Sequence, residues 1–278
     1  QLFMFTIPIL LSQILQQFYN IADTAIIGRY IGTDALAAIG STGLLISVIV
    51  NFFIGLSTGI SAVIANQFGA NEYDKLKKSI STSLAVSVLL GIVFTIGSLI
   101  FMKPIINILQ TPKGVYSLAI DYLKICFLGI TFQLLYNIGT AILRALGNTK
   151  DPLYFLIFSC ILNLILDILF IVYFGWGVKG AAIATLISQI LATLLVMYKI
   201  MSLDDNCKLS LKQIKIYKGY TKDIFLVGLP AGLQAIFMSI SSLIIQSSIN
   251  SFGAEAMAGM TIFAKVEGFL YFPLFSLG

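Results

Sequence analysis

Three acidic side chains lie inside long apolar runs of this 278-residue chain, namely Asp23, Asp167 and Glu267. The other acidic residues fall in polar connections or near the ends of the runs. At the centre of a bilayer a carboxylate costs at least about 2.5–3.5 kcal/mol, so an acidic residue kept there is a candidate for function. These three residues are therefore the first candidates for the chemistry of the protein.

Polar side chains form stripes along the same runs, each on one face of a predicted helix. Asp23 ends one stripe, and Asp167 ends another in which Ser159 and Asn163 precede it at steps of four. Spacings of three and four place side chains on one helix face. The stripes comprise Gln13, Gln16, Gln17, Asn20 and Asp23; Ser159, Asn163 and Asp167; Thr185, Gln189 and Thr193; and Gln133, Tyr136, Asn137, Thr140 and Arg144. We expect them to converge on a water-accessible cavity, while helix packing is the alternative for each single amide or hydroxyl.

Nothing in the sequence places a basic residue at membrane depth beside Asp23 or Asp167. Their carboxyl groups must then be protonated or neutralised by a cation from solution. Carboxylate, amide and hydroxyl oxygens suit a hard cation such as Na⁺, and burial favours the protonated form of a carboxyl group. In either case the site exchanges charge with the solution, as ion-coupled transport requires.

Eight apolar runs must position these side chains. Of the residues, 58% are hydrophobic and only 10% charged, whereas soluble domains carry about 25% charged residues. The runs lie at about 2–28, 36–66, 79–102, 118–144, 152–174, 179–201, 222–250 and 256–278. They are long and near-continuous, as membrane-spanning helices are, and not alternating like barrel strands. The composition predicts an all-α polytopic membrane protein and excludes an ordinary soluble enzyme.

Basic residues set the predicted orientation. Eleven of the 17 Lys and Arg residues follow the second, fourth and sixth runs, and short cytoplasmic loops are rich in these residues. The N-terminus and residues 202–221 are therefore predicted to be cytoplasmic. We also expect an amphipathic helix to begin at that surface over Asn71–Ser79, and an ion pair between Asp121 and Lys124.

Several classes of function are unlikely on composition alone. The sequence has no His, and its three Cys residues are scattered, which argues against zinc, haem and iron–sulfur sites. No nucleophile–base pair or phosphate-binding loop is visible, so we do not expect an enzyme. The net charge is +5, but the basic residues form no cluster of the kind that binds nucleic acid.

An internal repeat relates the first and seventh runs. Pro8 and Pro230 are 222 positions apart, and the Gly-x-acid-Ala segments at Gly32 and Gly253 are 221 apart. Both runs share one predicted orientation, so the repeat is parallel, as in transporters built from two similar bundles. Two copies would need about 444 residues, so we expect the chain to stop inside the second copy. The predicted domains are an N-lobe (1–201), a linker (202–221) and the start of a truncated C-lobe (222–278).

Over essentially its whole length, the chain resembles the multidrug and toxic compound extrusion (MATE) family of cation-coupled efflux transporters. The resemblance rests on the first run from Pro8 to Asp23, Thr24 and Gly28, on the loop 143–152, on Asn163 with Asp167, and on 266–269 followed by Pro273. The resemblance implies two pseudo-symmetric six-helix bundles that rock to give alternating access. It implies export of cationic or amphipathic compounds in exchange for H⁺ or Na⁺, across the plasma membrane and without a further cofactor.

In the DinF-like branch of that family the cation site lies in the N-lobe, and its matching positions here are Asp23, Asn163, Asp167 and Thr185. Pro8 matches a proline linked with helix bending. The NorM-like branch has a glutamate in the seventh span, where this chain has no acidic residue, which favours the N-lobe arrangement. We expect a monomer whose substrate path includes Gln13, Gln17, Asn20, Gln133, Tyr136, Asn137 and Glu267, with Phe18, Tyr19, Phe132 and Phe155 as aromatic candidates.

Two alternatives remain open. A lipid-linked saccharide flippase of the same superfamily would want Arg or Lys in its cavity to hold a pyrophosphate, and the two arginines, Arg29 and Arg144, lie near the ends of runs. A non-transporting receptor or scaffold would have no use for carboxyl groups inside the membrane. Substrate-dependent ion flux in liposomes distinguishes a transporter from this last class.

Overall fold

The computed structural model describes residues 2–108, 113–203 and 214–250. Within these ranges the chain forms helices and no strand, which confirms the predicted all-α class. The predicted run 256–278, with Glu267, lies outside the described residues. The elements are α1 (Leu2–Tyr30), α2 (Thr33–Gly69), α3 (Tyr73–Ile108), α4 (Lys113–Leu128), α5 (Ile130–Ala145), α6 (Lys150–Asp167), the π-helix η1 (Ile168–Tyr173), α7 (Gly177–Met201) and α8 (Lys218–Asn250).

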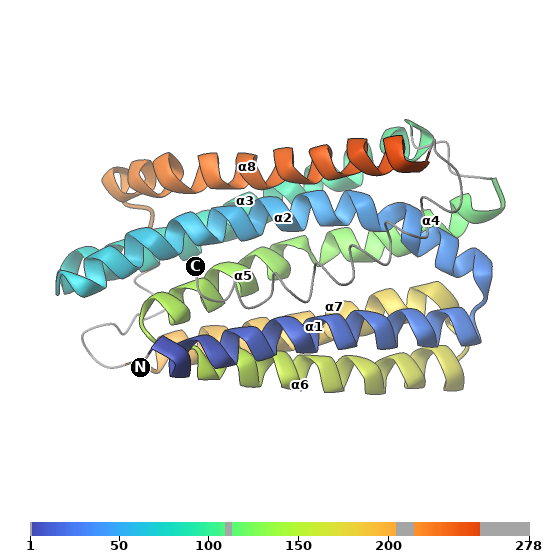
Figure 1. Cartoon of the computed structure of the whole chain (residues 1–278), viewed down its shortest axis with the longest axis horizontal. Coiled ribbons are helices and arrows are strands. Elements are labelled where there is room, and N and C mark those ends of the chain that lie inside the picture. The colour runs from blue at the N-terminus through green and yellow to red at the C-terminus, as the bar shows by residue number, and fades with distance from the viewer. Residues whose placement is uncertain (1, 109–112, 204–213, 251–278) are drawn as a thin grey trace.

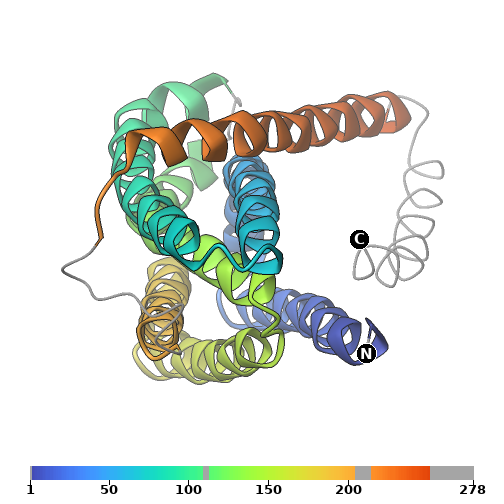
Figure 2. The same cartoon turned by 90° about the vertical axis from the view of Figure 1, so that its left-hand side faces the viewer.

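Most helices run roughly along one common direction in Figure 1, whereas Figure 2 shows α8 lying across that direction. Helices α8, α3 and α2 lie on one side of the bundle and α1, α6 and α7 on the other, with α5 between them (Figures 1 and 2). Antiparallel neighbours follow from short connections such as the one between α6 and α7, where Gly175 and Gly177 take φ values of 65° and 58°. Glycine adopts this left-handed conformation without steric cost.

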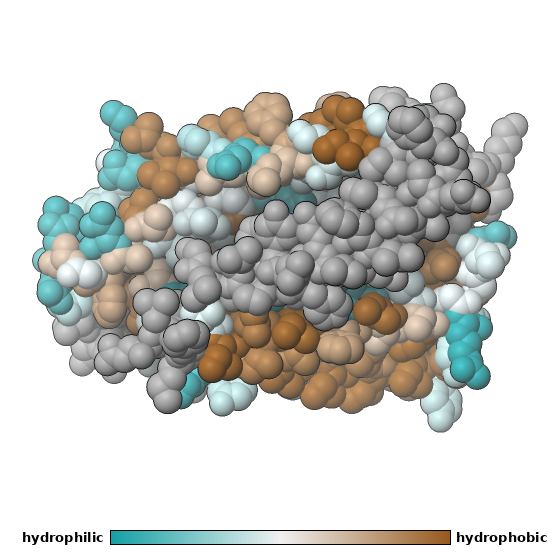
Figure 3. All heavy atoms as spheres, in the orientation of Figure 1, coloured by the Kyte–Doolittle hydropathy of each residue, from teal (hydrophilic) through white to brown (hydrophobic). Residues whose placement is uncertain are grey.

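The apolar surface fits a membrane environment. Among the described helices, five are long and apolar enough to cross a membrane, and the bent pair α4–α5 makes a sixth if it counts as one span. Helix α1 has 29 residues but carries the polar stripe that ends at Asp23. Figure 3 shows apolar residues over the lower helices, with hydrophilic residues gathered at the two ends of the molecule. The chain is therefore a multi-pass membrane protein.

Two helical irregularities depart from the predicted runs. The run 118–144 is not one straight helix, because α4 and α5 meet at Gly129 with a bend of 46°. At the bend, the Gly129 N–H donates to the carbonyl of Cys126 at 2.9 Å, a bond across three residues instead of four. The run 152–174 is α-helical only to Asp167, where η1 continues it. Such π-helical turns are frequent at functional sites.

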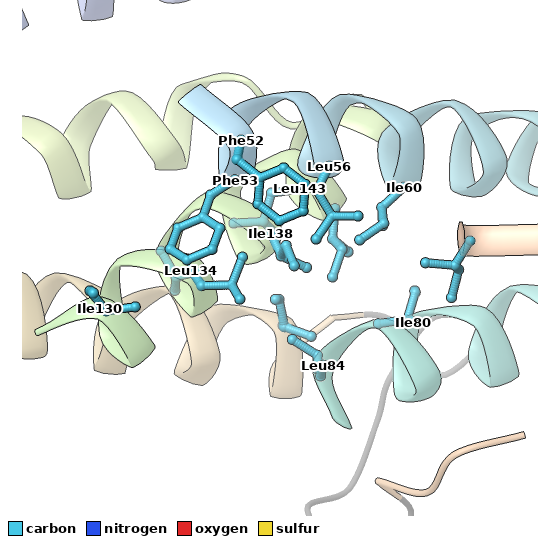
Figure 4. Packing of buried hydrophobic residues seen from close by; sticks show 14 of the residues in the cluster. Phe52, Phe53, Leu56, Ile60, Ile80, Leu84, Ile130, Leu134, Ile138 and Leu143 are labelled. Atoms are coloured by element: carbon cyan, nitrogen blue, oxygen red, sulfur yellow. The ribbon is translucent and has the colours of Figure 1, made fainter. Parts of the chain in front are cut away.

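The main core lies where α2, α3 and α5 meet. Its largest fully buried side chains include Phe53 and Leu56 on α2, Ile80 on α3 and Leu134 on α5, which point towards one another in Figure 4. The Phe53 ring meets the edge of Phe94 with 5.3 Å between centroids. This packing fixes α5 between the two sides of the bundle, and so fixes the polar face of α5 as well.

Helices α2 and α8 approach each other so closely that their contact has room only for glycine at four positions. Gly55 and Gly59 are four residues apart on α2, and Gly228 and Gly232 are four apart on α8. A methyl group on Gly59 would lie 2.4 Å from the Cα of Gly228, and one on Gly55 would lie 2.7 Å from the Cα of Gly232. Small residues at this spacing let membrane helices pack backbone to backbone.

The structure corrects one expectation about the ends of the helices and agrees with another. Asp121 forms its ion pair with Lys179 on α7 at 3.2 Å, and not with Lys124 on its own helix, because α4 and α7 pack together. A helix does begin within 71–79, because α3 starts at Tyr73 and continues to Ile108.

The chain before α8 is attached to α3 by hydrogen bonds. The Lys215 N–H donates to the Ser81 hydroxyl at 2.8 Å, that hydroxyl donates to the Lys215 carbonyl at 3.1 Å, and the Tyr217 N–H donates to Thr82 Oγ1 at 3.2 Å. The described end of the predicted linker therefore follows the surface of α3. The division into lobes stays a prediction.

We predict that Gly59→Ala destabilises the full-length protein, because the new methyl group must push α8 away from α2. Overpacking of this kind costs about 1–3 kcal/mol. The matched control is Gly97→Ala on α3, where an added methyl would meet nothing within 4 Å. Thermal unfolding of the purified protein in detergent measures both. Equal melting temperatures for the two variants would contradict the close contact.

Candidate functional site

Two carboxyl groups from different helices form the centre of the site. Asp23 on α1 and Asp167 on α6 interact through a side-chain hydrogen bond. Asp167 has an exposed fraction of 0%, and Asp23 is half-buried. Helices α1 and α6 run side by side in Figure 1, so side chains 144 positions apart in sequence come together. An ionised carboxylate only accepts hydrogen bonds, so this contact requires a proton on one of the two groups.

Asn163 and Thr185 extend the site to α7. In one orientation the Asn163 amide Nδ2 donates to Thr185 Oγ1 at 3.3 Å. In the other, Nδ2 donates to Asp167 Oδ2 at 2.8 Å and Oδ1 accepts from the Thr185 backbone N–H at 3.1 Å. The second orientation suits an ionised Asp167, because the carboxylate accepts. The second orientation also satisfies both atoms of the amide, whereas in the first the amide oxygen faces only acceptors and the nitrogen only donors.

The same two carboxyl groups keep unused hydrogen-bonding capacity. Asp23 Oδ1 and Asp167 Oδ1 are buried and have no hydrogen-bond partner. Buried polar atoms in proteins are almost always hydrogen-bonded, so an unpaired one calls for an explanation. The described residues contain no group of three or more His, Cys, Asp or Glu side chains that could hold a metal ion. An ion at this site would therefore be held by two carboxyl groups together with amide and hydroxyl oxygens.

A cavity of about 120 Å³ lies beside the site. Its walls come from α1, α5, α6 and α7, as the converging polar stripes predict. The lining residues include Tyr19 on α1, Gln133 and Tyr136 on α5, Asn163 on α6 and Thr185 on α7. The Tyr19 hydroxyl hydrogen-bonds to Thr185, so one threonine contacts both the cavity wall and the Asn163 amide.

A second cavity, of about 110 Å³, lies on the other side of a shared polar wall. Gln133, Thr185 and Gln189 line both cavities. The rest of the second cavity is mostly apolar and comes from α2, α4, α5 and α7, with Tyr122 and Cys126 as its other polar side chains. A ligand in either space would thus meet apolar surface together with two amides and a hydroxyl.

The structure brings some predicted residues to the site and leaves others apart. Asp23, Asn163, Asp167 and Thr185 meet, and Gln133 and Tyr136 line the cavity. Other candidates line neither cavity. On α1, Gln17, Phe18 and Asn20 are exposed and Gln13 is half-buried. On α5, the Asn137 amide donates to the Gln133 carbonyl of its own helix at 3.0 Å.

Sequence reasoning missed Cys160 and Tyr122. Cys160 is in the cavity wall, and the Tyr122 hydroxyl interacts with the Cys126 thiol and electrostatically with Asp23. Cys160 is three residues before Asn163 and thus on the same helix face. This spacing is a weak signal, because cysteine also packs as a small apolar residue. Tyr122 carries no such signal, since α4 reaches the site only through the tertiary fold.

Comparisons with known proteins agree with this arrangement. The sequence model of the MatE family matches residues 8–169. The chain is 31% identical to "Probable multidrug resistance protein YoeA" of Bacillus subtilis (strain 168), over 99% of this chain and 61% of that protein. It is 28% identical to "Multidrug export protein MepA" of Staphylococcus aureus (strain NCTC 8325 / PS 47), over 95% of this chain and 59% of that protein.

Solved structures give the same result for the fold. A MOP superfamily transporter from Pyrococcus furiosus matches with a TM-score of 0.90 at 27% identity, over 99% of this chain and 61% of that one. A MATE structure in a bent conformation matches with a TM-score of 0.91 at 28% identity, over 99% and 62%. The chain thus spans about three fifths of the length of these relatives. Because the family match covers more than half of its residues, the chain belongs to the MATE family of transporters.

Proposed function

We propose that the full-length protein is a secondary active efflux transporter that exports cationic or amphipathic compounds in exchange for H⁺ or Na⁺. The observation that carries the proposal is the pair Asp23 and Asp167, hydrogen-bonded to each other and each with a buried oxygen that lacks a partner. Such a pair binds a positive charge readily, because two ionised carboxylates in contact repel each other. The relatives named for multidrug resistance and export support the class of activity.

The coupling ion acts by occupying this pair. A proton or Na⁺ would give the buried and unpaired oxygens of Asp23 and Asp167 a partner. The Asn163 amide nitrogen donates to Asp167 Oδ2 at 2.8 Å and so holds this carboxyl group in place. Na⁺ would be held by oxygens of Asp23, Asp167, Asn163 and Thr185, a set that suits a hard cation.

The substrate competes with the ion through the shared wall of the two cavities. Thr185 contacts Asn163 and Tyr19 and also lines both cavities. A cationic amphipathic compound places its apolar part on the apolar walls and its charge towards the acid pair. Loading the pair with an ion removes the negative charge that attracts this cation, which makes export and ion entry mutually dependent.

Pro8 lies inside α1, on the N-terminal side of Tyr19 and Asp23, and weakens the backbone hydrogen bonding of the helix there. Proline has no N–H and leaves a carbonyl of the preceding turn without its helical partner. The Ser12 hydroxyl donates to the Pro8 carbonyl at 2.8 Å, so this turn also carries a side-chain bond to the backbone. Bending of α1 here moves Tyr19 and Asp23, which lie further along the same helix, relative to α6.

We expect Asp23→Asn and Asp167→Asn in the full-length protein to reduce drug efflux to the level of cells without the transporter, because an amide cannot take up a proton or replace a carboxylate for Na⁺. The matched control is Asp34→Asn, in the exposed first turn of α2, which should transport normally. Dye efflux from cells with equal amounts of each variant measures this. Undiminished efflux by both site variants would refute the mechanism.

The coupling ion can be identified from the way in which Na⁺ and pH change the melting temperature of the full-length protein. If Na⁺ binds, replacing choline chloride by NaCl at equal ionic strength should raise the melting temperature of the full-length protein, since a ligand at 100 times its Kd adds about 2.7 kcal/mol. If a proton binds instead, the melting temperature should rise as the pH falls, because the native site then holds a proton. Thr185→Val should remove the Na⁺ effect, and Thr58→Val, which changes an exposed threonine of α2, should keep it. A melting temperature that responds to neither ion would contradict ion binding.

A further inference from the structure

We propose that Arg144 binds the oxyanion of a ligand, a carboxylate or a phosphate, beside the part of the cavity wall that Tyr136 forms. The inference rests on the proposed function in that it places a second ligand-binding group in the same cavity. The inference also goes beyond the proposed function, because the proposed substrates are cations. A ligand that contacted both Arg144 and the acid pair would be a zwitterion.

Arg144 is a half-buried cation without a counter-ion. It lies in the last turn of α5. Ion pairs within the described ranges join Lys75 to Glu72, Lys179 to Asp121 and Lys199 to Asp151, and none of these three involves Arg144. Within the described ranges, none of the hydrogen bonds or ion pairs involves the Arg144 guanidinium, which carries five N–H donors. A half-buried polar group without a partner calls for an explanation, and a bound anion is one.

The ordinary structural role of such an arginine is already filled. Arginine near the end of a helix often donates to the last carbonyl groups. At the end of α5 the loop backbone does this instead, because the Leu146, Asn148 and Gly147 N–H groups donate to the carbonyls of residues 142, 143 and 144 at 2.9–3.1 Å. Gly147 has a φ of 86°, which allows the chain to turn back in this way. The guanidinium is therefore not needed to cap the helix.

The nearest carboxylate along the chain is also occupied. Asp151 accepts from Lys199 Nζ at 2.9 Å and from Asn148 Nδ2 at 2.6 Å. These two donors hold the Asp151 carboxylate between the first turn of α6 and the last turn of α7. Arg144 thus stays positive without an acidic neighbour, and it is free to meet an anion from outside the chain.

Arg144 lies close to a residue of the cavity wall. Side chains on a helix lean towards its N-terminus, and Tyr136, Thr140 and Arg144 follow each other at steps of four on one face. The guanidinium interacts electrostatically with Tyr136, which lines the cavity. Asp167 of the acid pair lies beside Asn163, another residue of that cavity wall. Arginine suits an oxyanion because its fork can donate two parallel hydrogen bonds.

Binding of two fluorescent probes to the full-length protein in nanodiscs tests the proposal. Nε-dansyl-lysine carries an amine and a carboxylate, and its methyl ester keeps the amine but lacks the anion. The wild type should bind the zwitterion roughly tenfold or more tighter than the ester, the scale of one charge-assisted hydrogen bond. Arg144→Gln should abolish this difference and leave ester binding unchanged, Arg144→Lys should keep part of it, and Arg29→Gln, at the exposed end of α1, should keep all of it.

A third probe distinguishes the source of the oxyanion. If dioctanoyl phosphatidic acid displaces the zwitterion from the wild type but does not bind Arg144→Gln, the site takes lipid phosphate as well as a substrate carboxylate. Equal binding of zwitterion and ester by the wild type, or an equal loss of both in Arg144→Gln, would overturn the proposal, as would a wild type that binds neither the zwitterion nor the lipid. Because these are equilibrium measurements, they stand even if Asp23→Asn and Asp167→Asn were to export drugs normally.

Discussion

A chain in hydrocarbon must satisfy its backbone hydrogen bonds within itself, and this constraint governs the whole structure. It explains why the described residues are helical over almost their whole length. It also explains the few irregular places. At Gly129 the backbone changes its hydrogen-bonding pattern and the span bends by 46°, and after Asp167 the helix widens into η1. Both places border the candidate site, because Gly129 lines the second cavity and Asp167 belongs to the acid pair.

The same constraint makes the acid pair informative. Asp167 is fully buried and its neighbour Asn163 is only 2% exposed, so the site cannot be explained as a surface feature. A protein gains nothing in stability from two carboxyl groups that repel each other and keep unpaired oxygens. Their joint presence is understandable if a positive charge from solution completes the arrangement during part of a working cycle.

The sequence predicts the fold class, and it predicts which helix faces are polar, because both follow from local periodicity. Asn163 and Asp167 are one helical turn apart, and no tertiary information is needed to place them on one face. The partners across helices are different. That Asp121 pairs with Lys179, or that Tyr122 approaches Asp23, depends on which helices pack together. The glycine pairs of α2 and α8 did carry a signal, a spacing of four, but the sequence does not tell which two helices use it.

The contact between α2 and α8 also determines how freely this protein can vary. Every missense change in a glycine codon adds at least a methyl group, and at Gly228 on α8 that group would lie only 2.8 Å from Leu56 Cδ1 on α2. A few residues away on α8, Leu226 and Phe237 are largely exposed, and another apolar side chain serves equally well in contact with lipid. Neighbouring positions of one helix therefore differ sharply in mutational tolerance. Sequence drift should be slowest where the protein has no side chain at all.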